Sequence, residues 1–281
     1  MPELDNAART EESTDTSPWA LVTGASAGIG ETFCRQLAAL GYHLVLVARR
    51  ADRLHALAAE LKALHGTASL VLPADLADPG APGAITKRLR DEDIHVEFLV
   101  NNAGYGVPGR FTDPGWEDHR DFIQVMMTAV CDLTWRLLPG MQARRKGYII
   151  NVASVAGLVP GSEGHTLYGA SKSFLIRYSE SLALENHHWN VHVSALCPGF
   201  TYTEFHDVIG TREMVNHLPG YMWLEADEVV RYGIESVRRD KPRTIAIPGR
   251  FYRVLVALNR FVPFFGTLTV KRMSKRFRKL D

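Results

Sequence analysis

The sequence predicts an α/β protein with a doubly wound, mostly parallel sheet of about seven strands and helices on both faces. Short apolar runs alternate with longer amphipathic runs up to about residue 200. This alternation is typical of repeated β-α-β units, whose strands lie parallel to one another. A glycine-rich turn at residues 23–30 also follows the first apolar run directly. Together, the two observations predict a Rossmann fold.

Each short apolar run is expected to form a strand, and each amphipathic run a helix. The expected strands are residues 20–24, 43–48, 68–74, 96–103, 147–154, 191–199 and 244–249. The expected helices are residues 30–41, 51–66, 117–145, 166–188 and 226–239. Gly41 closes the first helix, because glycine readily adopts the left-handed conformation found at helix ends.

Residues 18–249 are expected to form a single domain, because no linker interrupts them. The chain has 281 residues, of which 46% are hydrophobic, so it can bury a sizeable core. A net charge of +1 gives no reason to expect a nucleic-acid partner. Cys34, Cys131 and Cys197 are too few and too scattered for a disulfide framework or a zinc site, which indicates a reduced, cytoplasmic protein.

Three segments fall outside the regular alternation. Residues 1–17 are acidic and polar, and are expected to form a disordered leader. Residues 200–225 place aromatic residues among polar ones, as either a loop over an apolar substrate or a packing loop would. Residues 250–281 form a basic amphipathic tail that Pro263 interrupts. This tail either contacts a membrane surface or packs on the domain or across a dimer.

The turn "TGASAGIG" predicts a dinucleotide-binding site. Glycines allow the backbone to turn tightly and to approach a pyrophosphate, whose charge is stabilised at the following helix N-terminus. A structural tight turn would have the same composition, but here a strand precedes the turn and a helix follows it. The cofactor-binding candidates are Gly24, Ser26, Gly28, Ile29 and Gly30.

The second expected strand ends in Arg49 and Arg50. An acidic residue at this distance from the turn would hold the ribose hydroxyls of NAD, whereas arginine suits the additional phosphate of NADP. The pattern therefore favours NADP(H), and the alternative is two solvated arginines that open a helix. Asp75, after the third strand, is placed either to accept from an adenine amino group or to cap a helix.

The catalytic candidates are Ser154, Tyr168 and Lys172. Ser154 ends the fifth strand, and Tyr168 and Lys172 are four residues apart, which places them on one face of a helix. A neighbouring ammonium favours a phenolate, so Lys172 is expected to lower the pKa of Tyr168. Ser154 could donate a hydrogen bond to a carbonyl oxygen as charge builds there. An ordinary helix-surface pair is the alternative for Tyr168 and Lys172.

These motifs together resemble those of the short-chain dehydrogenase/reductase superfamily of the classical type. The resemblance covers about residues 18–250 and rests on five motifs in the order found in the family. They are "TGASAGIG", "NNAG" with Asn102, Ala103 and Gly104, "NVASVAG" with Ser154, "YGASK" with Tyr168 and Lys172, and "CPGFTYTEF" with Pro198, Gly199 and Thr203.

The resemblance implies an NADP(H)-dependent oxidoreductase that interconverts a ketone and a secondary alcohol. Tyr168 would be the acid or base, Lys172 would also hold the nicotinamide ribose, and Ser154 would orient the substrate oxygen. The asparagine and glycine residues in 101–106 suit a turn against the cofactor, although an ordinary strand-to-loop turn has the same composition. By resemblance, Pro198, Gly199 and Thr203 would line the nicotinamide end of the cofactor. The family implies a homodimer or homotetramer and no metal. An apolar substrate, acyl-chain or steroid-like, is suggested by the aromatic residues in 200–225 and by the tail.

One position departs from the family pattern. The long helix before the fifth strand normally carries an asparagine that helps to hold a water connecting the lysine to solvent, and this place falls on Met126. Methionine cannot donate the missing hydrogen bonds. Hydride transfer is therefore expected to survive, with proton supply to Lys172 that is slower or takes another route; Met126 could equally fill the core only. The alternative is a catalytically impaired NADP(H)-binding sensor or scaffold.

Overall fold

The computed structural model describes residues 17–107, 109–161, 163–164, 166–205 and 217–261. The expected leader therefore lies outside the described residues, except for Ser17. Residues 206–216 of the expected substrate loop and residues 262–281 of the tail, including Pro263, also lie outside them.

The described residues contain a seven-stranded sheet in the order β3-β2-β1-β4-β5-β6-β7, and every neighbouring pair is parallel. The strand order reverses between β1 and β4, and the crevice at such a switch point is where ligands bind in open α/β sheets. The strands are β1 (Trp19–Thr23), β2 (His43–Ala48), β3 (Ser69–Pro73), β4 (Val96–Asn101), β5 (Gly147–Val152), β6 (Val191–Leu196) and β7 (Ile245–Ala246). The predicted fold class is confirmed.

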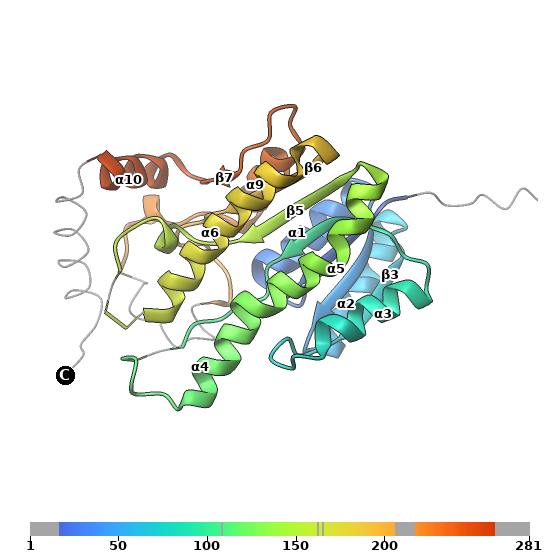
Figure 1. The fold of residues 1–281 in the computed structure, drawn as a ribbon, viewed down its shortest axis with the longest axis horizontal. Coiled ribbons are helices and arrows are strands. Elements are labelled where there is room, and N and C mark those ends of the chain that lie inside the picture. Colours follow the sequence, from blue (N-terminus) through green and yellow to red (C-terminus); the bar gives the residue numbers. More distant parts are fainter. Residues whose placement is uncertain (1–16, 108, 162, 165, 206–216, 262–281) are drawn as a thin grey trace, which may run out of the picture.

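Helices cover both faces of the sheet (Figure 1). One hydrophobic core packs α1, α2 and α9 against one face, and a second packs α3, α5 and α6 against the other. The strands are buried on both sides, which explains their nearly continuous apolar sequences. The helices are α1 (Gly28–Ala39), α2 (Ala51–His65), α3 (Ala81–Asp91), α4 (Trp116–Ile123), α5 (Ala129–Arg144), α6 (Thr166–Asn186), α9 (Ala226–Arg238) and α10 (Arg250–Phe261).

Helix α3 and the last strand differ from the sequence expectation. Helix α3 was not expected, because the glycines and prolines at its start are typical of a turn. Pro82 lies in its first turn, where a missing N–H costs no helical hydrogen bond, and Ile85 and Leu89 are buried four residues apart. The last strand has two residues rather than the expected six, because Pro248 offers no N–H to extend the ladder.

The long helix expected over residues 117–145 is interrupted by one π-helical segment, Gln124–Thr128, between α4 and α5. Met126 lies inside this segment and is buried. Single π-helical turns inside α-helices are frequent at functional sites, because the extra residue shifts the backbone and redirects its carbonyl groups.

The tail begins with α10, which one residue anchors at the carboxyl edge of the sheet. Tyr252 is buried, and its hydroxyl accepts a hydrogen bond from the backbone N–H of Phe200 at 3.0 Å and donates one to the carbonyl oxygen of Met222 at 2.5 Å. Its ring packs so closely on Gly199 that a Cβ atom there would lie 1.9 Å from Cζ of Tyr252. The first turn of α10 therefore supports the segment that follows β6.

Candidate active site

The glycine-rich turn forms a cradle without side chains between β1 and α1. Gly24 and Gly28 have φ angles of +67° and +55°, which favour glycine. A Cβ atom on Gly30 would lie 2.2 Å from the carbonyl oxygen of Gly24, so only glycine fits there. Ala27, at the N-cap, makes no side-chain cap, which leaves the first N–H groups of α1 for an anion. These features fit the pyrophosphate of a dinucleotide.

The end of β4 is fastened to this turn through Thr23. The Thr23 hydroxyl oxygen accepts hydrogen bonds from the backbone N–H groups of Asn102 at 2.9 Å and Ala103 at 3.0 Å. The Asn102 amide donates to the carbonyl oxygen of Thr23 at 2.9 Å. Gly104 allows the Met126 side chain to approach, since a Cβ atom there would lie 2.9 Å from its sulfur. Asn102, Ala103 and Gly104 therefore lie beside the glycine-rich turn, and Met126 is packed behind them.

A buried polar network that the sequence analysis missed supports the same region. The Asn101 amide donates to Asn151 Oδ1 at 2.8 Å and to Thr134 Oγ1 at 3.2 Å. Asn151 in turn donates to Ser179 Oγ at 2.8 Å. These four side chains come from β4, α5, β5 and α6, so the network fixes α6 relative to the sheet.

Arg50 lies against the glycine-rich turn. Its Nε and Nη2 atoms donate to the Ser26 hydroxyl at 3.1 and 3.0 Å. The backbone N–H of Ile29 belongs to the first turn of α1, in the same cradle. Arg49 is exposed. Arg50 rather than Arg49 is therefore joined directly to the expected dinucleotide site.

Asp75 has a local role in this structure. Its carboxylate accepts a hydrogen bond from the backbone N–H of Ala77 at 3.0 Å, and its side chain is exposed. This is an aspartate turn rather than the helix cap that was the alternative, since α3 begins at Ala81 with Gly80 at its N-cap.

Ser154 and α6 are held in contact by a short 3-10 turn, Val155–Gly157, that Ser154 caps. The Ser154 hydroxyl accepts from the N–H of Ala156 at 3.1 Å and lies 3.4 Å from the carbonyl oxygen of Pro198, to which it donates. A Cβ atom on Gly157 would lie 2.6 Å from the backbone of Lys172, so the turn rests directly on α6. This contact places Ser154 within hydrogen-bonding distance of the Tyr168 side chain.

Lys172 lies beneath Tyr168. Its Nζ atom is 5.6 Å from the centre of the Tyr168 ring and donates a hydrogen bond to the carbonyl oxygen of Val152 at 2.7 Å. Burial lowers the pKa of Lys172 to about 8. Burial also raises the pKa of Tyr168, against the opposing effect of the hydrogen bond with Ser154. The expected net lowering of the Tyr168 pKa is therefore wrong for this state of the protein, because desolvation outweighs the influence of its neighbours.

The segment after β6 crosses the glycine-rich turn. Pro198 and Gly199 follow the strand, and the Thr203 side chain lies over Gly28, where a Cβ atom would be 3.0 Å from Cβ of Thr203. The next aromatic ring, that of Phe205, lies 6.1 Å from the Tyr168 ring between centroids. The structure therefore brings Pro198, Gly199 and Thr203 to the same crevice as the catalytic candidates.

The described residues of the segment 200–225 lie in two different environments. Phe200 and Trp223 pack against a small core of Leu218 and Met222, as a packing loop would. Phe205, in contrast, faces Tyr168.

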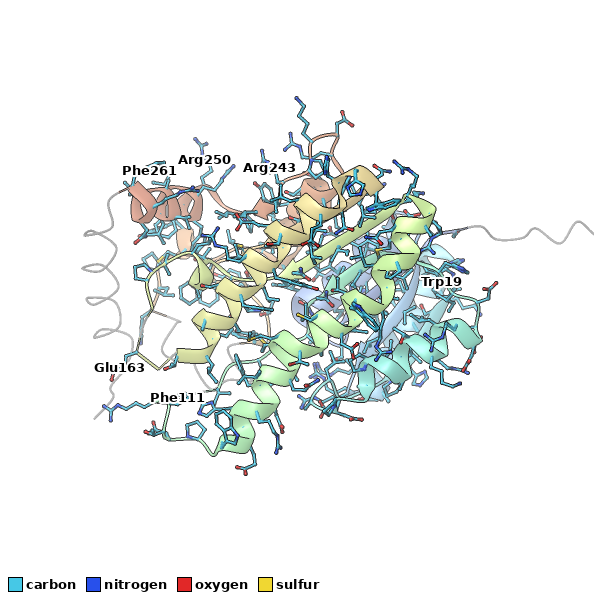
Figure 2. All side chains as sticks on the ribbon, in the orientation of Figure 1. Trp19, Phe111, Glu163, Arg243, Arg250 and Phe261 are labelled. Atoms are coloured by element: carbon cyan, nitrogen blue, oxygen red, sulfur yellow. The ribbon has the colours of Figure 1, made fainter. Side chains whose placement is uncertain are left out.

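A pocket beside Tyr168 is lined by residues from the segment between β4 and α4, from α4, and from the start of α6 with the residues before it. Arg110 and Glu163, 3.5 Å apart, connect two of these segments, and Figure 2 labels Glu163 and the neighbouring Phe111. The aromatic residues that line this pocket belong to no sequence motif, so the sequence did not predict them. The principal lining residues are Val107, Phe111, His119, Phe122, Leu167 and Tyr168.

The part of the chain that the structure describes contains no group of three or more histidine, cysteine or acidic residues able to hold a metal ion. Within the same part, no helix is long and apolar enough to cross a membrane.

Comparisons with known proteins agree with the geometry. The family model of short chain dehydrogenases matches residues 18–213. Nodulation protein G of Rhizobium sp. strain N33 is 39% identical over 194 residues, which are 69% of this chain and 77% of that protein. The 7beta-hydroxysteroid dehydrogenase of Collinsella aerofaciens is 31% identical over 202 residues, covering 72% of this chain and 73% of that one.

Among solved structures, a short-chain dehydrogenase from Sphingobium yanoikuyae in complex with NADPH has a TM-score of 0.77 and 34% sequence identity. The match covers 94% of this chain and 97% of that one. This chain therefore belongs to the short-chain dehydrogenase family, and is an oxidoreductase that acts on CH–OH groups with a nicotinamide cofactor.

Proposed function

We propose that this chain uses NADP(H) to interconvert an apolar ketone and its secondary alcohol, with Ser154, Tyr168 and Lys172 as the catalytic residues. The observation that carries the proposal is the convergence of these three side chains at the carboxyl edge of the sheet, next to the glycine cradle. A ketone reductase needs a site for the dinucleotide and a proton donor close to that site. The glycine cradle and the Tyr168 phenol fit these two needs.

In the reducing direction, Tyr168 is the proton donor. Its raised pKa keeps the phenol protonated at neutral pH, so it can give a proton to the carbonyl oxygen as negative charge builds there. Ser154, within hydrogen-bonding distance of Tyr168, holds the same oxygen. A bound nicotinamide supplies the hydride.

Lys172 is the residue that stabilises the phenolate left behind. With a pKa of about 8 it carries a positive charge on most molecules at neutral pH, and its Nζ atom lies under the Tyr168 ring. In a buried site this charge favours the phenolate more than it would in water. By resemblance, the same ammonium holds the ribose of the nicotinamide.

NADP(H) is the proposed cofactor because Arg50 is held against Ser26 of the cradle. The guanidinium is the side chain best suited to bind a phosphate in a bidentate manner. The Sphingobium relative, whose structure contains NADPH, supports the same choice.

The proposed substrate is apolar, with an acyl chain or a steroid-like ring system. Phe111, Phe122 and Leu167 line the pocket beside Tyr168, and the Phe205 ring lies 6.1 Å from the Tyr168 ring between centroids. The name of the Collinsella relative, a 7beta-hydroxysteroid dehydrogenase, is in agreement.

The test is to follow NADPH and NADH consumption by the purified chain with a panel of ketones. The panel contains steroid ketones, 3-oxoacyl thioesters and, as polar controls, keto sugars. We expect turnover with NADPH on apolar ketones. Faster turnover with NADH, or with the keto sugars, would contradict the proposed cofactor or the proposed substrate class respectively.

The second candidate function is an NADP(H)-binding sensor or scaffold with impaired turnover. It is favoured by Met126, whose buried side chain occupies the place of the family asparagine. Tight NADPH binding without turnover on any ketone of the panel would favour this candidate over the first.

The chain is further proposed to form a homodimer or homotetramer in the cytoplasm and to contact a membrane surface through its tail. Helix α10 supports the contact, because it presents exposed apolar and basic side chains and contains no acidic residue; Figure 2 labels its two ends, Arg250 and Phe261. Such a surface gains both apolar burial and attraction to anionic lipid.

A further inference from the structure

Two arginines, Arg53 of α2 and Arg50 directly before it, both pair with the carboxylate of Glu204, in the segment after β6. Arg53 Nη1 lies 3.0 and 2.9 Å from the two Glu204 oxygens, and Arg50 Nη1 lies 3.3 Å from one of them. The pair with Arg53, then that with Arg50, holds the pKa of Glu204 below its usual range. Glu204 is therefore ionised at neutral pH and bound to both guanidinium groups.

This cluster lies where the proposed cofactor needs a positive site. Arg50 binds the Ser26 hydroxyl of the glycine-rich turn with two nitrogens while its third nitrogen faces Glu204. A 2′-phosphate on the adenosine ribose of NADP(H) would need the same nitrogens. The Glu204 carboxylate thus takes the place of an anion at the adenosine end of the crevice.

The same ion pairs hold the segment that crosses the crevice. Thr203, one residue before Glu204, lies over Gly28 of the cradle. Phe205, one residue after it, lies beside Tyr168. The N–H of Tyr202 donates to the carbonyl oxygen of Leu224 at 3.0 Å, which fixes the start of the segment. Residues 201–205 are therefore held near their start by the hydrogen bond to Leu224 and near their end by the ion pairs of Glu204 with the two arginines.

We propose that Glu204 is an internal competitor of the cofactor 2′-phosphate for Arg50 and Arg53, and that its displacement frees residues 201–205 from the two arginines, which leaves Thr203 able to move to the nicotinamide end of the bound cofactor. This inference rests on the proposed use of NADP(H). A phosphate carries more negative charge and more acceptor oxygens than a carboxylate, so the exchange favours the cofactor. NAD(H) has no anion to exchange for Glu204, so Glu204 determines cofactor specificity in addition to the arginines.

The binding test uses two cofactor fragments, 2′,5′-ADP and 5′-AMP, which differ by the 2′-phosphate alone. Their affinities are measured by calorimetry for the unmodified chain, for Glu204→Gln and for Glu235→Gln. Glu235 is an exposed residue of α9, so the last variant changes the net charge equally. We expect Glu204→Gln to bind 2′,5′-ADP about three- to tenfold tighter, the effect of losing two exposed ion pairs. Its affinity for 5′-AMP, and both affinities of Glu235→Gln, should change less than about twofold.

The results separate this inference from the proposed cofactor. Preference of the unmodified chain for 2′,5′-ADP, with no gain in Glu204→Gln, overturns the competition and leaves the NADP(H) proposal standing. Equal gains in Glu204→Gln and Glu235→Gln overturn it as well, since net charge then accounts for the effect. If neither the unmodified chain nor Glu204→Gln prefers 2′,5′-ADP to 5′-AMP, both the competition by Glu204 and the use of NADP(H) are overturned.

Release of the segment is tested by hydrogen exchange at the Tyr202 amide. We expect 2′,5′-ADP, and not 5′-AMP, to speed this exchange in the unmodified chain, because breaking the ion pairs frees the hydrogen bond to Leu224. In Glu204→Gln the exchange should be fast before any ligand is added. Unchanged exchange on adding 2′,5′-ADP at saturation would overturn the release.

Discussion

The ammonium of Lys172 lies 5.6 Å from the centre of the Tyr168 ring and donates a hydrogen bond to the carbonyl oxygen of Val152. Burial favours the neutral form of both side chains, so the pKa of Tyr168 is raised and the pKa of Lys172 is lowered to about 8. Loss of the Tyr168 proton would create a phenolate beside the ammonium, and that charge pair offsets the desolvation of both groups. The charge of Lys172 and the proton of Tyr168 are therefore coupled.

The pH dependence of stability should reveal the buried lysine. Its pKa falls from an ordinary 10.5 to about 8, so the unfolded chain binds more protons than the folded one between these values. Stability gains from this group as pH rises through that window, by up to about 3 kcal/mol. Lys172→Met removes the cost of burying a charged ammonium. The thermal stability of this variant relative to the unmodified chain should therefore be highest near neutral pH and should decline toward about pH 10.

The matched control for this prediction is Lys87→Met, which removes an exposed ammonium. Its effect on the melting temperature should be similar at both pH values. A relative stability of Lys172→Met that does not change with pH would contradict the lowered pKa of Lys172.

Met126 should limit the supply of protons to Lys172. Met126→Asn restores the polar side chain of the family inside the π-helical segment, next to Gly104. We expect a higher kcat, on the order of a fewfold, and a smaller solvent isotope effect. Met127→Asn makes the same change one residue further along the segment and should leave both quantities unchanged. An unaltered rate and pH profile in Met126→Asn would show that proton supply does not limit turnover.

Gly30 should tolerate no side chain. A Cβ atom there would lie 2.2 Å from the carbonyl oxygen of Gly24, so Gly30→Ala must separate α1 from the turn. Such overpacking costs about 1–3 kcal/mol, and where NADPH binding must restore the original geometry of the turn, its affinity falls by about 5- to 150-fold. Gly161→Ala, where the Cβ atom meets open space, is the control. Equal NADPH affinity in the two variants would argue against a pyrophosphate at this cradle.

Helix α10 should mediate the membrane contact. Leu258 and Phe261 are 53% and 80% exposed, so replacing both with serine removes apolar surface without disturbing the anchor at Tyr252. We expect the full chain to sediment with vesicles of phosphatidylglycerol and the double variant to do so several-fold less, on the order of the loss of two buried apolar side chains. Ala257→Ser should sediment like the unmodified chain. Equal sedimentation of all three proteins would discard the contact through α10.

The sequence was sufficient where function depends on local chemistry. The cradle of Gly24, Gly28 and Gly30 needs positive φ angles or close backbone approach, which few other residues allow, so its motif is visible in the letters. The spacing of Tyr168 and Lys172 likewise follows from helix geometry. Each of these predictions required only a strand, a turn or a helix to form as expected.

The features that the sequence did not reveal depend on segments far apart in the chain. Arg53 and Glu204 meet across 151 residues, and Asn101 and Asn151 across 50, so neither contact has a local signal. The raised pKa of Tyr168 arises from burial, which only the packed molecule defines. The sequence suggested the catalytic residues, but their electrostatic balance required the fold.

The central claim is that Tyr168 is the proton donor in ketone reduction. Its most direct test is a single-turnover reduction of one apolar ketone, chosen from the panel because the unmodified chain reduces it. Stereospecifically deuterated NADPH is used with the unmodified chain and with Tyr168→Phe, which keeps the ring beside Phe205 and loses only the hydroxyl. The account predicts deuterium in the alcohol product and a rate at least about a hundredfold lower in Tyr168→Phe, with NADPH affinity changed less than twofold. Deuterium transfer at an undiminished rate in Tyr168→Phe would contradict the assignment of Tyr168 as the proton donor.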